Sequence, residues 1–249
     1  MKILKKINLI FLFFTSPFLF LTSQSKAQKT IFFSGYNWKI KNATDEKVGP
    51  GSNFFDAKNV FIDKNGHLHL QLKKDKISGK WACAEVILQD SLGFGTYQFW
   101  VEGHIDKLDK NIVFGLFDYK GFDGFEENDI EFARWGNEKN NNLNYTVYPS
   151  QGTSGKSQTF DQEITLKSSY STHRFLREPN QITFQSFTGF QHGSNVHQIA
   201  SHIFNEENII LSKTTMPINI NLWLFKGNPP SDGKDVEIII RQFKYTSSK

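Results

Sequence analysis

The chain is poor in cysteine. Cys83 is the only cysteine in 249 residues, so an intrachain disulfide is excluded, and with it the small domains that depend on such cross-links. A chain of this length can bury enough surface to be stable without them. Ala82 and Ala84 flank Cys83 in an apolar segment. This setting predicts a small, packed side chain rather than a nucleophile.

A hydrophobic run long enough to cross a membrane is also missing. The N-terminal apolar run covers residues 9–21, and a helix of roughly 13 residues spans about 20 Å against about 30 Å for the bilayer core. Lysines precede this run, and a small-x-small pattern ends at Ala27. These features predict a signal peptide over residues 1–27 and secretion of residues 28–249 to an extracellular or periplasmic location.

Neither sign of charge is in excess once that segment is set aside. Four of the 29 lysines and arginines belong to the predicted signal peptide, which contains no acid, so residues 28–249 carry 25 basic and 25 acidic residues. A near-neutral chain has no electrostatic motive to bind nucleic acid or an anionic membrane. We therefore expect a monomer, with no membrane contact after signal cleavage, whose partner is uncharged or weakly charged.

The sequence lacks amphipathic helical periodicity, internal repeats and long low-complexity linkers. Instead, alternating runs of β-branched and aromatic residues are separated by turn-forming residues, which is typical of strands. Strands are expected at residues 30–40, 67–74, 81–89, 95–103, 111–119, 128–134, 142–148, 171–176, 181–187, 217–225 and 236–245. The pattern predicts one all-β domain, a two-sheet β-sandwich of the jelly-roll type.

Three carboxylates stand at every second residue of one predicted strand. Glu127, Asp129 and Glu131 would project from the same face, because successive side chains of a strand point to opposite sides. Like charges this close resist joint ionisation, so at least one acid should hold a proton near neutral pH. Glycoside hydrolysis needs such a set, with one carboxylic acid to protonate the leaving oxygen and one carboxylate to attack or to activate water.

Spacing alone leaves other interpretations open. The same pattern suits a solvated acidic strand face, a calcium site, because oxygen ligands bind hard cations, or a sugar-binding module that uses the acids as hydrogen-bond acceptors. The two glutamate Cα atoms would lie about 13 Å apart at roughly 3.3 Å per residue. Long side chains that lean together can close most of that gap.

The residues around the acids resemble glycoside hydrolase family 16, which includes lichenases, laminarinases and related β-glucanases. The pattern Glu127-x-Asp129-x-Glu131, followed by Trp135 and Gly136, is similar to the unbulged form of the active-site strand of that family. The resemblance continues through the strand from Trp81 to Glu85, the Gly-Phe-Gly turn at residues 93–95, the loop ending at Asn53 and the strand from Asn219 to Trp223. It covers essentially all of residues 30–246.

This resemblance implies roles for the acids. Glu127 would be the nucleophile, Glu131 the general acid/base, and Asp129 would orient the two and hold charge between them. It implies a retaining mechanism on a concanavalin A-like jelly roll, with residues 28–249 as the catalytic domain. The groove would bind sugar through Asn53, Trp81, Glu85, Trp135, Asn142, Asn144, Asn221 and Trp223.

The function expected from the sequence is a secreted endo-glycosidase that hydrolyses internal β-linkages of a neutral, β-glucan-like polysaccharide. We expect no cofactor and no catalytic metal. A structural calcium ion is compatible with this expectation. A transglycosylase of the same fold and a non-catalytic carbohydrate-binding protein are the alternatives. Linkage and sugar stay open.

A few polar residues stand outside this scheme. His67 and His69 share a strand face, which predicts surface pairing, whereas the later histidines at every fifth residue from His192 suit no metal site. Arg134 has the opposite parity to the acids, which favours an ion pair outside the groove. Asn128 occupies a core-facing position where the family usually has an apolar residue. Either the start of this strand is partly exposed, or Asn128 supports Glu127 from behind.

Overall fold

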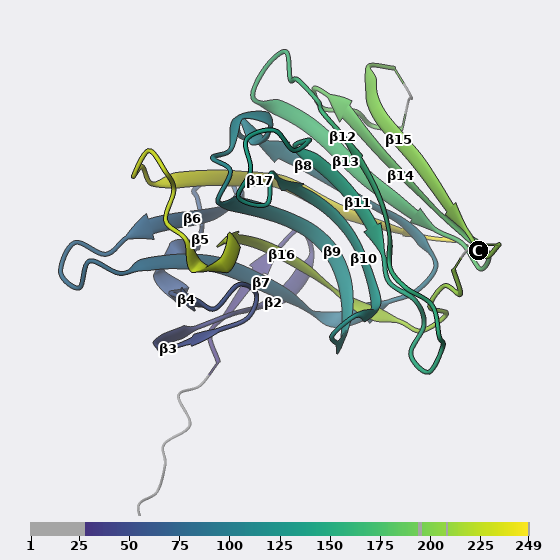
Figure 1. Cartoon of the computed structure of the whole chain (residues 1–249), viewed down its shortest axis with the longest axis horizontal. Coiled ribbons are helices and arrows are strands. Elements are labelled where there is room, and N and C mark those ends of the chain that lie inside the picture. Colours follow the sequence, from purple (N-terminus) through teal and green to yellow (C-terminus); the bar gives the residue numbers. More distant parts are fainter. Residues whose placement is uncertain (1–27, 194–195, 208, 249) are drawn as a thin grey trace, which may run out of the picture.

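The computed structural model describes residues 28–193, 196–207 and 209–248, and the predicted signal peptide lies outside these ranges. Two curved, mainly antiparallel sheets pack face to face (Figure 1). Within the described residues, no helix is long and apolar enough to cross a membrane. The prediction of an all-β sandwich is confirmed.

The first sheet is called the groove sheet. In spatial order its strands are β1 (Thr30–Phe33), β2 (Tyr36–Ile40), β7 (Trp81–Leu92), β16 (Met216–Leu224), β9 (Ile112–Phe122), β10 (Phe125–Ala133), β11 (Leu143–Val147) and β12 (Gln158–Gln162). The predicted acidic strand is β10, and it lies between β9 and β11 in the sheet.

The second sheet is called the outer sheet. Its spatial order is β5 (Val60–Ile62), β6 (Leu68–Lys74), β17 (Val236–Ser247), β8 (Gly95–Glu102), β13 (Tyr170–Arg177), β14 (Gln181–Thr188) and β15 (Gln198–Asn205). A short pairing of β6 with β7 joins the two sheets. The remaining elements are β3 (Ala43–Val48), β4 (Asn53–Phe55) and three 3₁₀ helices, η1 (Ala57–Asn59), η2 (Ile105–Lys107) and η3 (Phe225–Gly227).

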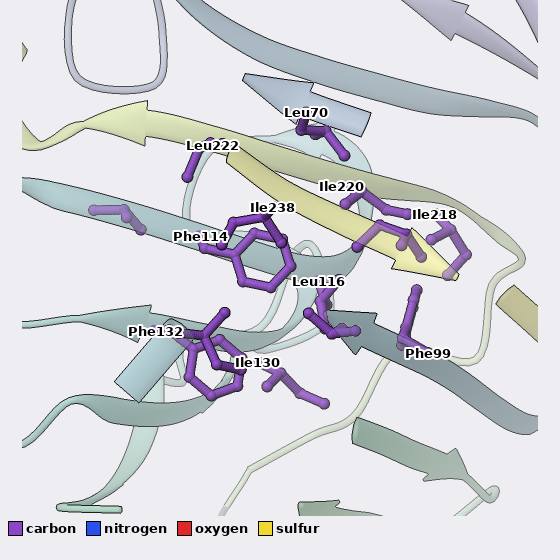
Figure 2. Packing of buried hydrophobic residues seen from close by; sticks show 14 of the residues in the cluster. Leu70, Phe99, Phe114, Leu116, Ile130, Phe132, Ile218, Ile220, Leu222 and Ile238 are labelled. Carbon is purple, nitrogen blue, oxygen red and sulfur yellow. The ribbon is translucent and has the colours of Figure 1, made fainter. Parts of the chain in front are cut away.

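The core lies between the sheets, and Figure 2 shows part of it. Every second side chain of β9, β10 and β16 points into it and meets side chains of the outer sheet. The buried residues drawn there are Leu70, Phe99, Phe114, Leu116, Ile130, Phe132, Ile218, Ile220, Leu222 and Ile238, each at most 1% exposed. Burial of each such side chain contributes about 1.5–3 kcal/mol. The opposite face of β10 is thereby turned away from the core.

The predicted strand at residues 30–40 is wrong in one respect, because it is a hairpin. Ser34 and Gly35 both have positive φ, 53° and 86°, as a two-residue type I′ turn requires. The turn pairs β1 with β2. The sequence did not predict this turn, because Asn or Asp is the usual residue at its first position and this chain has a serine there.

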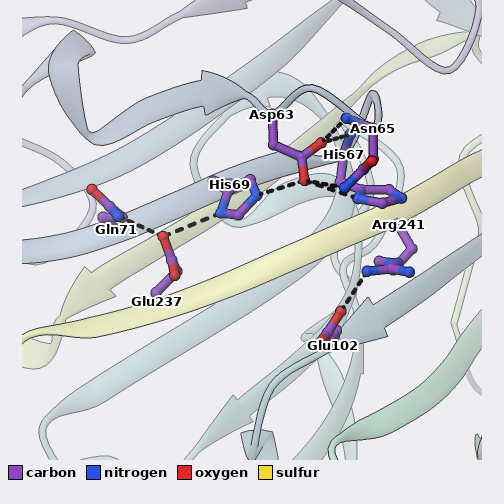
Figure 3. Close-up of polar contacts among 8 residues, drawn as sticks. All are labelled: Asp63, Asn65, His67, His69, Gln71, Glu102, Glu237 and Arg241. Carbon is purple, nitrogen blue, oxygen red and sulfur yellow. Dashed lines mark hydrogen bonds and ion pairs between the residues drawn. The ribbon is translucent and has the colours of Figure 1, made fainter.

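On the outer sheet, Figure 3 shows a row of polar contacts among β6, β17 and the turn before β6. His67 Nδ1 lies 3.1 Å from Asp63 Oδ2, and His69 Nδ1 lies 3.2 Å from Glu237 Oε1. The predicted surface pairing of these histidines is therefore confirmed. No group of three or more His, Cys, Asp or Glu suited to a metal ion occurs in the described part of the chain.

Candidate active site

Three carboxylates line a groove on the exposed face of the groove sheet. Glu127, Asp129 and Glu131 of β10 all border this groove, whose volume is about 570 Å³. Between them, Ile130 is fully buried on the core side of the strand. The alternation read from the sequence therefore holds along β10, because its ladders with β9 and β11 keep the strand extended through this segment.

A straight row of residues crosses the groove through Glu131. Ladder pairing sets Glu85 of β7 beside Asn221 of β16, Asn221 beside Gly115 of β9, Gly115 beside Glu131, and Glu131 beside Asn144 of β11. Adjacent strands are about 4.8 Å apart, so the row extends over roughly 19 Å.

Gly115 leaves room for the side chain of Asn221 in the middle of that row. A Cβ atom at this position would lie 2.5 Å from Asn221 Oδ1 and 3.4 Å from the ring of Phe117. Its φ is not in the left-handed region, so the glycine is explained by space and not by backbone conformation. The side chain of Asn221 therefore lies against Gly115, on the strand next to Glu131.

Burial raises the pKa of all three acids. Desolvation raises the pKa of Glu127 to about 8, with further contributions from the negative charges of Glu131, Asp118 and others. Desolvation raises the pKa of Glu131 to about 7, and desolvation together with the two glutamates raises that of Asp129 well above its ordinary value. Carboxyls this close share their protons and release them stepwise as a set. At neutral pH the triad holds at least one proton, which a general acid requires.

Several polar atoms around the triad are buried with nothing to bond. Within the described residues, Asp129 Oδ1, Asn221 Oδ1 and Trp223 Nε1 have no hydrogen-bond partner. Buried polar atoms are usually paired, because leaving one unpaired costs about 1–3 kcal/mol. All three belong to side chains that line the groove. They comprise one hydrogen-bond donor and two acceptors.

Aromatic rings form one wall of the groove. Trp135 and Trp223 both line it, with ring centroids 6.3 Å apart, and Phe225 packs edge-on against Trp135 at 5.6 Å. Trp135 Nε1 donates to Asn144 Oδ1 at 3.2 Å, and Asn144 Nδ2 donates to Ala133 O at 3.0 Å. Asn144 thus orients an aromatic wall.

Glu85 forms the far end of the row, and Lys41 of the β2–β3 connection pairs with it. Lys41 Nζ lies 3.1 and 3.0 Å from the two carboxylate oxygens of Glu85 and donates to Gly49 O at 2.7 Å. Burial raises the pKa of Glu85, and the Lys41 ammonium opposes this shift. Sequence reasoning selected Glu85 but missed Lys41, because the two are brought together only by the β2–β7 pairing.

Four residues expected to bind sugar do not line this groove, namely Asn53, Trp81, Asn142 and Asn144, the last of which holds Trp135. Asn53 is 4% exposed and donates through Nδ2 to Pro50 O and Leu224 O, so it secures the loop at the groove edge. Asn142 Nδ2 donates to Asp106 O and Ile164 O, which ties two loops together. Trp81 packs against the core where β7 meets β6.

The groove also contains residues that were not predicted as site residues, namely Lys41, Gly49, Pro50, Phe117, Tyr119, Asp123, Gly124, Tyr148 and Asn219. The alternation of strand side chains could have predicted three of them. Phe117 and Tyr119 project from the same face as Gly115, and Asn219 projects from the same face as Asn221. Asp123 lies in the β9–β10 turn, where Tyr119 Oη donates to it at 2.8 Å. Nothing in the local sequence predicts that this turn folds toward the acids.

Two smaller predictions are confirmed. Cys83 is fully buried, and burial raises the pKa of its thiol to about 12, so it is a packed side chain. Arg134 forms an ion pair with Glu163 at 2.6 Å and does not border the groove. Asn128 is 2% exposed, so the start of the strand is not exposed at that position.

Comparison of the whole structure with solved structures gives clear matches. A β-glucanase of Bacillus licheniformis superposes with a TM-score of 0.63 at 20% identity, covering 90% of this chain and all of that one. The fold is that of the family 16 β-glucanases. A lichenase from a mouse hindgut metagenome superposes with a TM-score of 0.60 at 19% identity, covering 86% and 94% of the two chains.

The same fold occurs in a protein of Mycobacterium tuberculosis described as an immunostimulatory antigen and pseudo β-1,3-glucanase. It superposes with a TM-score of 0.63 at 15% identity, covering 85% of this chain and 91% of that one. No protein-family model and no curated protein matches the sequence. At these identities the likeness establishes the fold alone, so function rests on the site itself.

Proposed function

We propose that this chain is a glycoside hydrolase of family 16 that cleaves internal β-linkages of a neutral polysaccharide with retention of configuration. One observation carries the proposal: three carboxylates with raised pKa values stand on one strand face, at the floor of an open groove. A solvated acidic face would not be buried. The alternative of a metal site lacks a suitable ligand group among the described residues.

In the proposed mechanism Glu127 attacks the anomeric carbon while Glu131 protonates the departing glycosidic oxygen, which leaves a covalent glycosyl-enzyme. Glu131, now ionised, then takes a proton from water, and the resulting attack releases the sugar from Glu127. Asp129, between them, holds a proton that it can share with either neighbour. The assignment of the two glutamates follows the resemblance to the family, and the ladder pairs Glu131 with Gly115.

Charge supports a neutral substrate. The groove is bordered by the triad and by Asp123, and Lys41, the cation among the described lining residues, is paired with Glu85. A polysaccharide with sulfate or carboxylate groups would meet repulsion that no free cation offsets.

The test is turnover on a panel of neutral β-glucans and galactans, followed by analysis of the anomeric configuration of the first product. We expect Glu127→Gln and Glu131→Gln each to lower kcat by about 10³-fold or more, because each removes a group that acts in the transition state. Azide should partly restore turnover to Glu127→Ala by replacing the nucleophile, with a product of inverted configuration. Azide should not increase the yield of inverted product from Glu131→Gln. Absence of turnover on every polymer would sink the proposal.

The alternative is a sugar-binding protein without turnover. A solved structure with the same fold is described as a pseudo β-1,3-glucanase. It predicts oligosaccharide binding that survives Glu127→Gln and Glu131→Gln alike, with no product from the wild type. Secretion and a monomeric state stay part of the proposal. Mass analysis of the protein exported by the producing cell would test cleavage after Ala27.

A further inference from the structure

A buried polar cluster lies behind the acidic strand, on the core side. Asn128, Asp118 and Arg177 are 2%, 0% and 1% exposed. Asn128 Nδ2 donates to Asp118 Oδ1 at 2.6 Å, and Arg177 Nη1 lies 3.0 Å from Asp118 Oδ2. Arg177 ends β13 of the outer sheet and reaches across the sandwich to β9. These three residues are called the Arg177 cluster.

The same guanidinium has a second connection to β10. Arg177 Nη2 donates to Ser212 O at 3.1 Å and to Thr214 O at 3.0 Å. The hydroxyl of Thr214 in turn donates to Glu126 Oε2 at 3.3 Å. Glu126 is 5% exposed, and its φ of 51° lies in the left-handed region.

That backbone conformation falls where the β9–β10 register shifts, between Phe125 and Glu127. Register shifts of this kind re-aim the side chains beside them, and a glutamate in the left-handed region needs surrounding contacts to hold it there. Glu126 has them, since Ser150 Oγ contacts its other carboxylate oxygen and its amide donates to Pro149 O. Residues 126 and 128, on either side of Glu127, are thus both linked to Arg177.

Stability alone does not explain the cluster. Buried ion pairs can often be replaced by apolar side chains of similar volume with no loss of stability, and the neighbouring core positions of β9 and β10 are Leu116 and Ile130. We infer that the Arg177 cluster fixes the backbone of β10 at Glu127, so that Asn128, Asp118 and Arg177 are positioning residues for the nucleophile. The role of Glu127 as nucleophile rests on the proposed function. The claim that the Arg177 cluster fixes the backbone at Glu127 does not depend on that function.

Three variants test it. Asn128→Leu removes one connection at similar volume. Thr214→Val removes the other on an exposed loop, so the protein should fold normally. The triple variant Asp118→Leu, Asn128→Leu, Arg177→Met replaces the whole cluster by apolar side chains. Ile130→Val is the matched control, because it loosens the same face of β10 and leaves the cluster intact.

The first readout is amide hydrogen exchange at residues 126–128, which needs no turnover. We expect exchange there to accelerate at least tenfold in Asn128→Leu and in the triple variant, and about threefold in Thr214→Val, relative to the protein as a whole. Ile130→Val should change local and global exchange together. Unchanged protection at residues 126–128 would overturn the inference even if the protein proved to be no enzyme.

The second readout is kinetic and separates positioning from mere folding. Asn128→Leu should lower kcat about tenfold with KM within twofold of the wild type, and labelling of Glu127 by a 2-fluoro-glycosyl inactivator should slow by the same factor. Ile130→Val should lower neither. An active wild type whose Asn128→Leu and Thr214→Val forms label Glu127 at the normal rate would refute the inference and leave the proposed function standing. A wild type inactive on every polymer would refute the proposed function instead.

Discussion

At the scale of single residues, burial determines the chemistry of the groove. The three acids of β10 and Glu85 all have raised pKa values, and in each desolvation is the largest cause. Glu85 differs from the others because it has a cation beside it. Its carboxylate is 6% exposed and the Lys41 side chain 25%. The Lys41 ammonium therefore opposes the rise that burial causes in the pKa of Glu85.

Lys41→Met tests that pair. The substitution leaves the Glu85 carboxylate buried without a partner, which should lower the free energy of unfolding at pH 7 by about 2 kcal/mol, allowing for the partial exposure of the lysine. The pKa of Glu85 then rises further above its unfolded value, so the loss should disappear below about pH 4.5 and grow as pH increases. Urea unfolding at pH 4 and pH 7 measures it. Equal losses at both pH values would contradict the ion-pair explanation, and adding Glu85→Leu should restore stability.

At the scale of elements, β9 decides where the Asn221 side chain lies beside β10. Gly115 is the only position of the central row, from Glu85 to Asn144, without a side chain, and the space is taken by Asn221 Oδ1. We expect Gly115→Ala to fold, because its φ suits any residue, and to displace Asn221. The value of kcat/KM should fall about 10–100-fold, which corresponds to about 1.4–2.7 kcal/mol of transition-state stabilisation.

Gly93→Ala is the control for that change. A Cβ at residue 93 would meet only Thr215 Cγ2, at 3.7 Å, outside the groove. Its kinetics should match those of the wild type. If Gly115→Ala also kept the wild-type kcat/KM, the position of Asn221 beside Gly115 would not matter for turnover.

Strands were predictable where one face is buried and the other is not. The alternation of β9, β10 and β16 gave their positions to within a few residues, because the period of two is imposed by the core. The missed strands β5, β12 and β15 are edges of their sheets, β3 is largely exposed, and the missed strand β4 is only three residues long. An edge strand packs on fewer neighbours, so its sequence alternates less. The missed β1–β2 turn depended on a serine with positive φ, which has no strong local signal.

At the scale of the whole molecule, two groups of buried residues set opposite pH trends. The triad has folded pKa values above the unfolded ones, so its contribution to stability is present in acid and is lost as pH rises from about 4.5 towards 8. His173, enclosed between Ser171 and Ser186, has its pKa lowered to about 3 by burial. Its contribution is present above about pH 6.5 and is lost as pH falls through the acid range.

The free energy of unfolding should therefore peak in mildly acidic solution, near pH 5–6.5. Glu127→Gln should raise stability at pH 8 by about 2 kcal/mol and have little effect at pH 4. His173→Gln should flatten the decline between pH 6.5 and 4. Urea unfolding from pH 4 to 9 would show both effects. A wild-type curve that rises steadily to pH 9 would contradict the burial of the triad.

The sequence by itself determined the fold class, the strand that carries the acids and the face from which they project. Those properties are local, since the period of two and the spacing of Glu127, Asp129 and Glu131 are written in consecutive residues. The remote contacts were decided only by the tertiary structure. Lys41 meets Glu85, Asn144 holds Trp135, and Arg177 reaches Asn128 through Asp118, because strands far apart in the chain become neighbours when two sheets curve around one core.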